Sequence, residues 1–329
     1  MSPRKTKGHS VLVTGASAPI GERLVRHLLD DSRITHIIAA TGQAPETFPV
    51  PNSKRLTVVQ VDLKKTRQVH DLLFGPARDH KVGTLIHTAM HLSAMDEGGR
   101  VHAFNVDSVR NLLELCERHP TIGRVVFRSA SAVYQVQRDL PLLIAEDHPL
   151  NMARNAPQWV RDRVEADLTA CVRMGVAPLE ITVLRMAEAL APGTGSQMFD
   201  FLQAPVCFHP AGFDPMVNLL TIEDTVGALS CAIHGRSQGV FNVPGADTLP
   251  LTTCIRRWGR VGIPTPDNML GPLYRLRRRL TGSEFRYGMN RRWLIYSGVL
   301  DGTRAQEVLG YVPSHPIDWP AAPRPPEDL

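Results

Sequence analysis

Two residues on one predicted helix are of types that can hold a ligand without exchanging protons with it. In "APQWVRDRVEADL" (156–168), Trp159 and Arg163 are four residues apart, a spacing that places both on one helix face. An indole N–H donates a hydrogen bond but does not shuttle a proton near neutral pH, and a guanidinium stays charged. This pair can therefore bind hydroxyl groups, but acid/base catalysis would need another residue.

A glycine-containing turn near the N-terminus is of the kind that approaches phosphate groups. In "VLVTGASAPIGERL" (11–24), Gly15, Ala18 and Gly21 follow a strand-like run and open a helical one. Gly15 permits a tight turn, position 18 lets the backbone approach a pyrophosphate, and Gly21 allows close packing of helix on sheet. The helix N-terminus that follows would face the phosphates with its free N–H groups.

These motifs lie in a regular alternation of strand and helix patterns. We expect strands at 10–15, 35–40, 56–63, 83–89, 124–130 and 180–187, and helices at 19–31, 66–74, 106–119 and 157–175. This order is typical of a parallel sheet with helices on both faces. The last helix has a buried face predicted from spacing, made of Val160, Val164, Leu168, Cys171 and Val172. The chain is thus predicted to be an α/β protein with a doubly wound parallel sheet.

The composition of the sequence changes after Ala191. Pro and Gly become more frequent there, and the predicted helices and strands become shorter. We therefore expect a first domain at 1–190, with a flexible tail at 1–9, and a smaller C-terminal lobe at 191–329. Within that lobe, 217–245 should return to pack on the first domain. The Pro-rich end, 319–329, is predicted to be a flexible tail.

The chain resembles an extended short-chain dehydrogenase/reductase, of the NAD-dependent epimerase/dehydratase superfamily. The blocks that match in order are "TGASAPIG", "VDL", "HTA", "FNVDSVRNLLE", "RSASAVY", "LLTIEDTVGAL", "GVFNVPG" and "LDGTRAQEVLGYVP". They cover nearly the whole chain. The resemblance implies a Rossmann-like fold with a smaller C-terminal substrate-type lobe.

The resemblance also implies a site for NAD or NADP, with departures from the family pattern. Ala18-Pro19 replaces a Gly and a large residue, so the turn has an added methyl and one N–H fewer. The position that would bond the adenosine ribose is Ala40 or Thr41, and no Arg follows it. The cofactor-binding residues carried over are Gly15, Ala18, Ile20, Gly21, Asp62, Leu63, His87, Ala89, Asn105 and Arg163.

The catalytic set that the family uses is a Ser or Thr, a Tyr that shuttles a proton and a Lys that lowers its pKa. The matching positions here are Ala130, Trp159 and Arg163, with Ser129 and Ser131 flanking the first. Tyr134 is the candidate substitute for the missing phenol, although packing is the simpler role for it. Three departures at one constellation indicate a degenerate member of the family.

Three functions stay open at this point. The first is a non-catalytic nucleotide-sensing or scaffold protein, with a nucleotide or sugar-nucleotide as ligand. The second is an active NAD(P)-dependent enzyme with an unconventional acid/base. The third is a cofactor-free protein-interaction module. Relatives also suggest a homodimer.

Composition bounds the remaining possibilities. The net charge is +5, and residues 251–292 hold ten Arg against Asp267 and Glu284. We expect segment 275–292 either to be solvated or to face an anionic ligand or surface, and nucleic acid ranks last because no recognised motif accompanies it. Five scattered Cys argue against disulfides and a thiolate metal site, so no metal is expected. Without a signal sequence or an apolar run of membrane-spanning length, the expected location is the cytoplasm.

Overall fold

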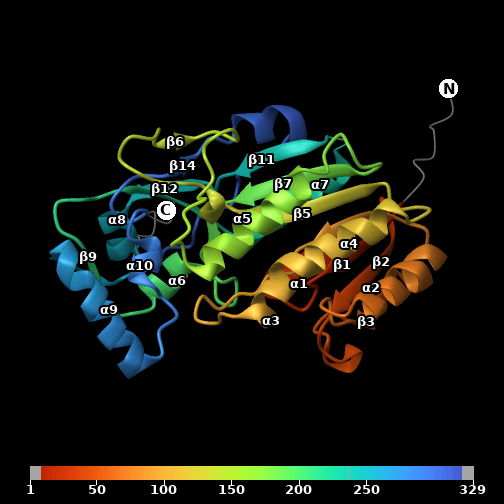
Figure 1. Cartoon of the computed structure of the whole chain (residues 1–329), viewed down its shortest axis with the longest axis horizontal. Helices are drawn as coiled ribbons and strands as arrows, with labels where there is room; N and C mark the ends of the chain where they lie inside the picture. The colour runs from red at the N-terminus through yellow and green to blue at the C-terminus, as the bar shows by residue number, and fades with distance from the viewer. Residues whose placement is uncertain (1–8, 236, 321–329) are drawn as a thin grey trace, which may run out of the picture.

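Seven parallel strands form the central sheet of the computed structural model, which describes residues 9–235 and 237–320. Their order across the sheet is β11-β7-β5-β4-β1-β2-β3 (Figure 1). The strands are β1 His9–Thr14, β2 Ile34–Thr41, β3 Leu56–Gln60, β4 Val82–His87, β5 Arg124–Ala130, β7 Glu180–Met186 and β11 Gly239–Val243. The structure thus confirms the predicted doubly wound parallel sheet.

Helices cover both faces of this sheet because its strands alternate apolar residues on two sides. Val11 and Val13 belong to one core cluster, while Leu12 between them belongs to the other. The first cluster includes α1 Pro19–Asp30 and α7 Ile222–His234. The second includes α2 Thr66–Leu72, α4 Ser108–Glu117 and the end of α5 Gln158–Cys171. The carboxyl ends of the strands thereby become the edge at which loops gather.

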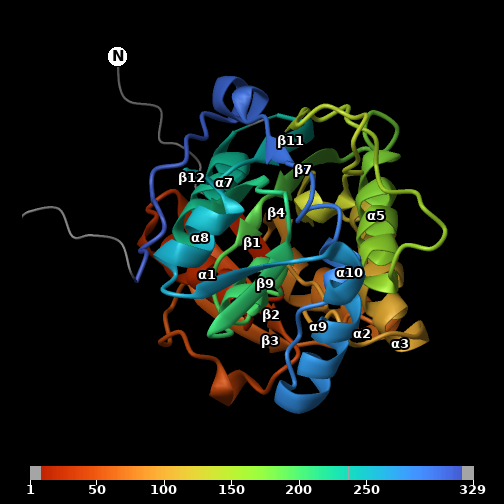
Figure 2. The ribbon, with the colours of Figure 1, turned by 90° about the vertical axis from the view of Figure 1, so that its left-hand side faces the viewer.

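A third hydrophobic cluster lies in the C-terminal part, around residues such as Phe201, Tyr274 and Phe285. Its helices gather at one end of the molecule, onto which Figure 2 looks. The remaining helices are α3 Gly99–His102, α6 Gln197–Leu202, α8 Leu251–Arg257, α9 Asp267–Thr281 and α10 Tyr287–Asn290. The small sheets pair β8 Glu188–Ala189 and β12 Asp247–Pro250 with β10 Met216–Leu220, β9 Val206–Pro210 with β13 Val261–Thr265, and β6 Leu143–Ile144 with β14 Val299–Leu300.

Segment 217–245 contains most of β10, all of α7 and all of β11. β11 pairs in parallel with β7, and α7 packs on α1, so both elements belong to the sheet layers. The predicted tails lie outside the described residues, apart from residues 9, 319 and 320. In the described part of the chain, no helix combines the length and the hydrophobicity needed to cross a bilayer.

Two local predictions differ from the structure. β3 ends at Gln60 rather than at residue 63, because Asp62 forms a turn in which its side chain accepts from the Lys64 N–H at 3.1 Å. Val172 was predicted to be buried, but it lies beyond the end of α5 and is 65% exposed. The buried face of α5 includes the predicted Val160 and Val164 together with the charged residues Asp162, Arg163 and Asp167.

Asp167 connects α5 to the sheet through a buried ion pair. Its carboxylate accepts from Arg185 of β7 at 2.6 and 3.0 Å and from the Ser129 hydroxyl of β5 at 2.6 Å. Arg185 also donates to the Tyr134 hydroxyl at 3.2 Å, which in turn donates to Asn242 of β11 at 2.6 Å. Four elements thus share one polar network inside an apolar core.

We expect Asp167→Asn to destabilise the fold by about 3–5 kcal/mol, because it leaves the Arg185 guanidinium buried without its counter-charge. Urea denaturation measures this free energy. The matched control is Glu22→Ala, which breaks the half-exposed Glu22–Arg26 pair of α1 and should cost less than about 1 kcal/mol. Equal costs for the two variants would contradict this role of Asp167.

Candidate functional site

The turn between β1 and α1 requires glycine at both ends. Gly15 has φ +71°, and a Cβ there would lie 2.7 Å from the Ala89 backbone. A Cβ on Gly21 would lie 2.2 Å from the carbonyl oxygen of Gly15. No real Cβ contact is so short, so these positions accept only glycine and bring the turn close to β4.

The first turn of α1 offers two free backbone N–H groups. Ala18 donates to Gly15 at 3.1 Å, and Pro19 has no N–H. Within the described part of the chain, the N–H groups of Ile20 and Gly21 have no acceptor, and no side chain caps this helix. The Ile20 side chain lies in the core, so only its backbone can serve a ligand. This helix end can therefore bind an anion in spite of Pro19.

A cavity of about 410 Å³ opens beside this helix end. Ala40 and Thr41, at the end of β2, form part of its wall, and neither carries a charge. The sequence-predicted residues in its lining are Gly15, Ala18, Asp62, Leu63 and Ala89. Its volume and the free N–H groups fit the adenosine diphosphate portion of a dinucleotide.

Two narrow cavities, of about 20 and 30 Å³, continue from this one toward α5. Ala89 and Met90 line both the first narrow cavity and the large one, while Arg128, Ser129 and Arg163 line both narrow ones. The first narrow cavity brings together His87, Ala89, Asn105 and Arg163, and the second brings together Ala130, Trp159 and Arg163. Of the predicted site residues, Ile20, Gly21 and Tyr134 line none of these three cavities.

Trp159 and Arg163 contact each other face to face. The Arg163 guanidinium carbon lies 3.3 Å from the centre of the Trp159 ring, a cation–π contact. Arg163 also donates to the carbonyl oxygens of Trp159 at 3.0 Å and His91 at 3.2 Å. Burial, and next the charge of Arg128, lower the pKa of Arg163 well below its ordinary value. The Trp159 indole N–H is buried without a partner among the described residues.

Two of the three hydroxyls in "RSASAVY" are already engaged. Ser129 donates to Asp167, and Tyr134 is fully buried in the Arg185 network. Burial raises the pKa of Tyr134 to about 12. Ser131 differs, because it lines both the second narrow cavity and a further, apolar cavity. Ser129 also lines both narrow cavities, so Ser131 is distinguished by its hydroxyl, which has no hydrogen-bond partner among the described residues.

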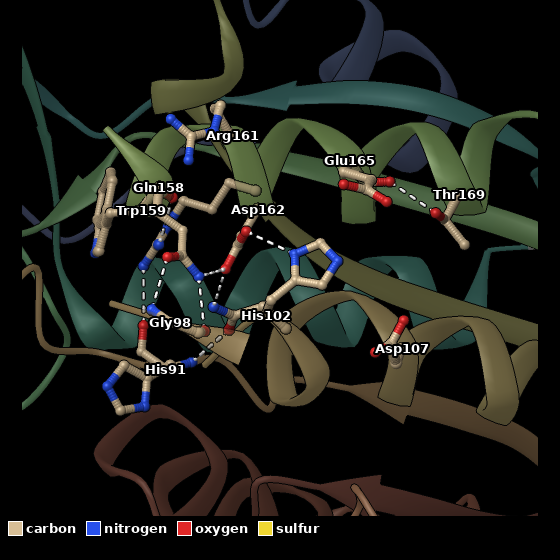
Figure 3. Close-up of polar contacts among 12 residues, drawn as sticks. His91, Gly98, His102, Asp107, Gln158, Trp159, Arg161, Asp162, Glu165 and Thr169 are labelled. Carbon is tan, nitrogen blue, oxygen red and sulfur yellow. Dashed lines mark hydrogen bonds and ion pairs between the residues drawn. The ribbon is translucent and has the colours of Figure 1, made fainter. Parts of the chain in front are cut away.

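Asp162 organises a polar cluster on the side of α5 next to Arg163. Figure 3 shows its carboxylate between His102 and Gln158. It accepts from His102 at 2.9 Å, Asn105 at 3.3 Å and Gln158 at 3.2 Å, and the hydrogen bond to Asp162 raises the pKa of His102. Asn105 in turn accepts from the His91 N–H at 2.9 Å. Asn105 thus holds the loop that follows β4 against α5.

Glu188 lies where the second narrow cavity meets the apolar one. Its carboxylate accepts from the Ser196 hydroxyl at 2.9 Å and the Met198 N–H at 2.7 Å. Burial raises its pKa. The residues that make the last cavity apolar include Met198, Met216, Val217, Leu219, Phe285, Met289, Trp293 and Leu294.

Sequence reasoning missed Arg128, Asp162 and Glu188. A signal was available for two of them, since Arg128 directly follows the strand-like run "RVVF" and Glu188 directly follows "ITVLRMA". A charge at the carboxyl end of a buried parallel strand faces the edge where ligands bind in such sheets. Asp162 had no comparable signal, because a helix pattern does not tell which charged residue is buried.

The Arg-rich segment 275–292 makes contacts within the C-terminal part and to the loop after β4. Arg277 donates to Val206 at 3.1 Å, Arg286 binds Glu97 at 2.8 Å and Arg291 binds Asp267 at 2.9 Å. None of its seven arginines lines any of the four cavities described above. Its remaining exposed arginines are Arg275, Arg279 and Arg292.

Comparisons with known proteins agree with this geometry. The sequence model of the "NAD dependent epimerase/dehydratase family" matches residues 11–198, more than half of the chain. An uncharacterized protein of Mycobacterium tuberculosis is 29% identical over 312 residues, which cover 92% of this chain and 80% of that protein. An uncharacterized protein of Mycobacterium bovis matches to the same extent.

Several solved structures share the fold at low sequence identity. MoeE5 in complex with UDP-glucuronic acid and NAD is 21% identical with a TM-score of 0.66, covering 93% of this chain and 94% of that one. UDP-glucose 4-epimerase of Thermotoga maritima is 16% identical with a TM-score of 0.68, covering 92% and 93%. WbmG of Bordetella bronchiseptica, in complex with NAD, is 16% identical with a TM-score of 0.69, covering 97% and 93%.

We expect Gly15→Ala to destabilise the fold by about 1–3 kcal/mol, because a Cβ at φ +71° is strained and meets the Ala89 backbone. Gly42→Ala, also in the wall of the large cavity, is the matched control, since its Cβ would meet nothing within 4 Å. That variant should stay within about 0.5 kcal/mol of the wild type in urea denaturation. A tolerated Gly15→Ala would show that the turn can open.

His87 should make the protein less stable in acid. Burial lowers its pKa to about 4, from 6.5 in the unfolded chain. Between these two values the unfolded chain binds a proton that the folded chain does not, so stability is fully present above pH 6.5 and falls toward pH 4. We expect this residue to account for up to about 3 kcal/mol of that loss.

The measurement compares urea denaturation at several pH values for the wild type and His87→Gln. The variant should lose less stability on acidification than the wild type. His70→Gln, at an exposed histidine of α2, should follow the wild-type curve. Parallel curves for the wild type and His87→Gln would contradict the assignment.

Proposed function

The chain belongs to the NAD-dependent epimerase/dehydratase family, and from this premise we propose that it binds a nucleotide cofactor without carrying out the standard redox step. Its role would then be that of a nucleotide sensor or scaffold. The observation that carries this proposal is the stacked pair of Trp159 and Arg163 at the positions of the family's Tyr and Lys. Neither side chain can pass a proton to and from a substrate.

Three features support nucleotide binding. Gly15 brings the turn close to β4, the N–H groups of Ile20 and Gly21 are free, and the cavity beside them has a volume of about 410 Å³. When bound, NAD or NADP would supply a hydride acceptor or donor. The residues that would hold its adenosine diphosphate portion are those of this turn together with Asp62.

The large cavity and the two narrow ones together form a cleft, whose inner end is the pair of narrow cavities beside α5. The residues near this inner end support the loss of the standard redox step. Ala130 has no hydroxyl, and Tyr134 is fully buried, hydrogen-bonded to Asn242, with its pKa raised to about 12. Loss of general acid/base assistance lowers rates by about two to four orders of magnitude. With Tyr134 held in the core, the inner end lacks the phenol that the family's chemistry uses.

One observation favours the alternative of an active enzyme. Glu188 has a raised pKa and shares its cavities with Ser131 and the Trp159 indole. Such a carboxyl could act as the unconventional acid/base. The adjoining cavity is mostly apolar and has no Lys or Arg in its lining, so an apolar alcohol or ketone suits it better than the sugar-nucleotides held by the structural neighbours.

We expect NAD⁺, NADH, NADP⁺ or NADPH to raise the unfolding temperature in a thermal-shift titration, since a ligand that binds only the folded state stabilises it by about 2.7 kcal/mol at a hundredfold excess over its Kd. Gly15→Ala should weaken this response. Absorbance of the reduced nicotinamide, followed with alcohols, ketones and UDP-glucose, should show no turnover.

Each alternative predicts a different result. Turnover by the wild type that is abolished in Glu188→Gln, with cofactor binding unchanged, would establish the active enzyme. No thermal shift with any of the four cofactors at millimolar concentration would favour the cofactor-free interaction module. Turnover gained by a Trp159→Tyr/Arg163→Lys variant that binds cofactor like the wild type would confirm that these two positions account for the loss of the standard step.

A further inference from the structure

Arg128 is a partly buried cation without a counter-charge. It lies near the carboxyl end of β5 and lines both narrow cavities. Within the described part of the chain its side chain has no hydrogen bond or ion pair, and its Nε is buried without an acceptor. Burial lowers its pKa to about 10, which leaves it charged at neutral pH.

Arg163 brings a second such cation to the same two cavities. It is 95% buried, since 5% of its surface is exposed. Its terminal nitrogens donate only to backbone carbonyl oxygens, and its Nε has no acceptor among the described residues. Hydrogen bonds to neutral carbonyl groups orient the guanidinium but do not neutralise it.

The charges of Glu188 and Asp162 raise the pKa of Arg163 and so offset only part of the effect of its burial, because neither carboxylate lies within ion-pair distance of it. Asp162 is held by His102, Asn105 and Gln158, and Asp167 is paired with Arg185. Glu188 accepts from Ser196 and Met198, and its pKa is raised by burial. In the described part of the chain, none of these carboxylates forms an ion pair with Arg128 or Arg163. His87, in the first narrow cavity, is neutral at pH 7.

Two guanidinium groups, one buried and one partly buried, that line the same cavities without an ion pair are costly for the folded protein. An anion placed between them would reduce that cost, because it would accept charge-assisted hydrogen bonds from the guanidinium groups. We propose that Arg128 and Arg163 form an anion-binding site at the inner end of the nucleotide cleft, for a phosphate, sulfate or carboxylate group.

The route into this site passes the nucleotide cavity. Ala89 and Met90 line both the large cavity and the first narrow one, so a ligand that enters beside α1 reaches Arg128 without crossing the core. The anion is either a group on the nucleotide ligand itself or a separate ion that binds beside the nucleotide. The site does not depend on nucleotide binding, since the features that support nucleotide binding lie at the turn between β1 and α1, beside the large cavity.

The site also has a consequence for the cofactor. The oxidised nicotinamide ring carries a positive charge, whereas the reduced ring is neutral. Two uncompensated cations at this end of the cleft disfavour the oxidised form. This effect on the cofactor rests on the proposed function, because it requires that a dinucleotide enters the cleft.

The test is a titration of sodium sulfate, at constant ionic strength, followed by thermal shift and calorimetry with and without saturating ADP. ADP occupies the free N–H groups of α1, which are a second place where sulfate could bind. We expect sulfate to raise the unfolding temperature in both conditions. Arg128→Met and Arg163→Met should each weaken sulfate binding by at least about tenfold, equivalent to about 1.4 kcal/mol.

The matched control is Arg279→Met, at an exposed arginine of α9, which should bind sulfate within about twofold of the wild type. The ligand-free variants provide an independent result. Removal of an uncompensated, partly buried charge should raise the unfolding temperature of Arg128→Met above that of the wild type, and sulfate should reduce this difference. This gain also shows that the variant folds.

The outcomes separate the two proposals. If ADP fails to bind but sulfate binding still depends on Arg128, nucleotide binding is wrong and the anion site stands. If ADP-ribose 5″-phosphate displaces sulfate and ADP does not, the anion that occupies the site is a group of the nucleotide ligand. If sulfate binds together with every nucleotide, the anion is a separate ion. Equal sulfate responses in the wild type, Arg128→Met and Arg163→Met would overturn the anion site.

Discussion

The carboxylate of Asp167 holds α5 in place against the sheet. It is fully buried, and it binds Arg185 of β7 and Ser129 of β5. The buried face of helix α5 combines apolar residues such as Val160 and Val164 with Asp162, Arg163 and Asp167, so the charged residues as well as apolar packing define how the helix is rotated. A buried ion pair with one geometry does so, because any other rotation would leave Arg185 unpaired in the core. The positions of Trp159 and Arg163 follow from that rotation.

Helix α5 carries two kinds of buried charged residue, namely carboxylates that have hydrogen-bond partners and an arginine that has no ion-pair partner. Toward its C-terminal end, Asp167 has its full set of partners, and on one side Asp162 is satisfied by His102, Asn105 and Gln158. Toward the cavities, Arg163 is stacked on Trp159 and lacks a carboxylate. A core that satisfies its buried acids but leaves Arg163 and the partly buried Arg128 facing a cavity without an ion pair is consistent with the proposed anion site.

The sheet and the turn between β1 and α1 could be predicted from the sequence because both depend on local patterns. Short runs such as 10–15 and 35–40 are apolar on both faces, and Gly15 and Gly21 stand at strand-to-helix spacing. The inner end of the cleft could not be predicted in the same way. Whether Arg128, Asp162 or Glu188 is buried depends on which elements pack around it, and those elements are distant in the sequence.

Val172 illustrates the same limit from the other side. Its spacing matches the face of α5 that includes Val160 and Val164, yet it is 65% exposed while both of these are buried. Periodicity predicted the existence of the helix but not its end, and the charged residues on the helix determined the buried face. The fold could thus be read from apolar spacing, whereas the candidate site follows from charge pairing in three dimensions.

The position of β11 in the sheet has a consequence for biosynthesis. Gly239–Val243 pairs with Glu180–Met186, so the outer edge of β7 stays unpaired until the ribosome has made and released the segment between them. During that time the Tyr134 hydroxyl also lacks Asn242, its partner on β11. Parallel pairing over such a distance in sequence is slow, and an open apolar edge is prone to aggregation. The nascent chain therefore passes through a stage in which it is most dependent on chaperones, and that stage ends when β11 docks.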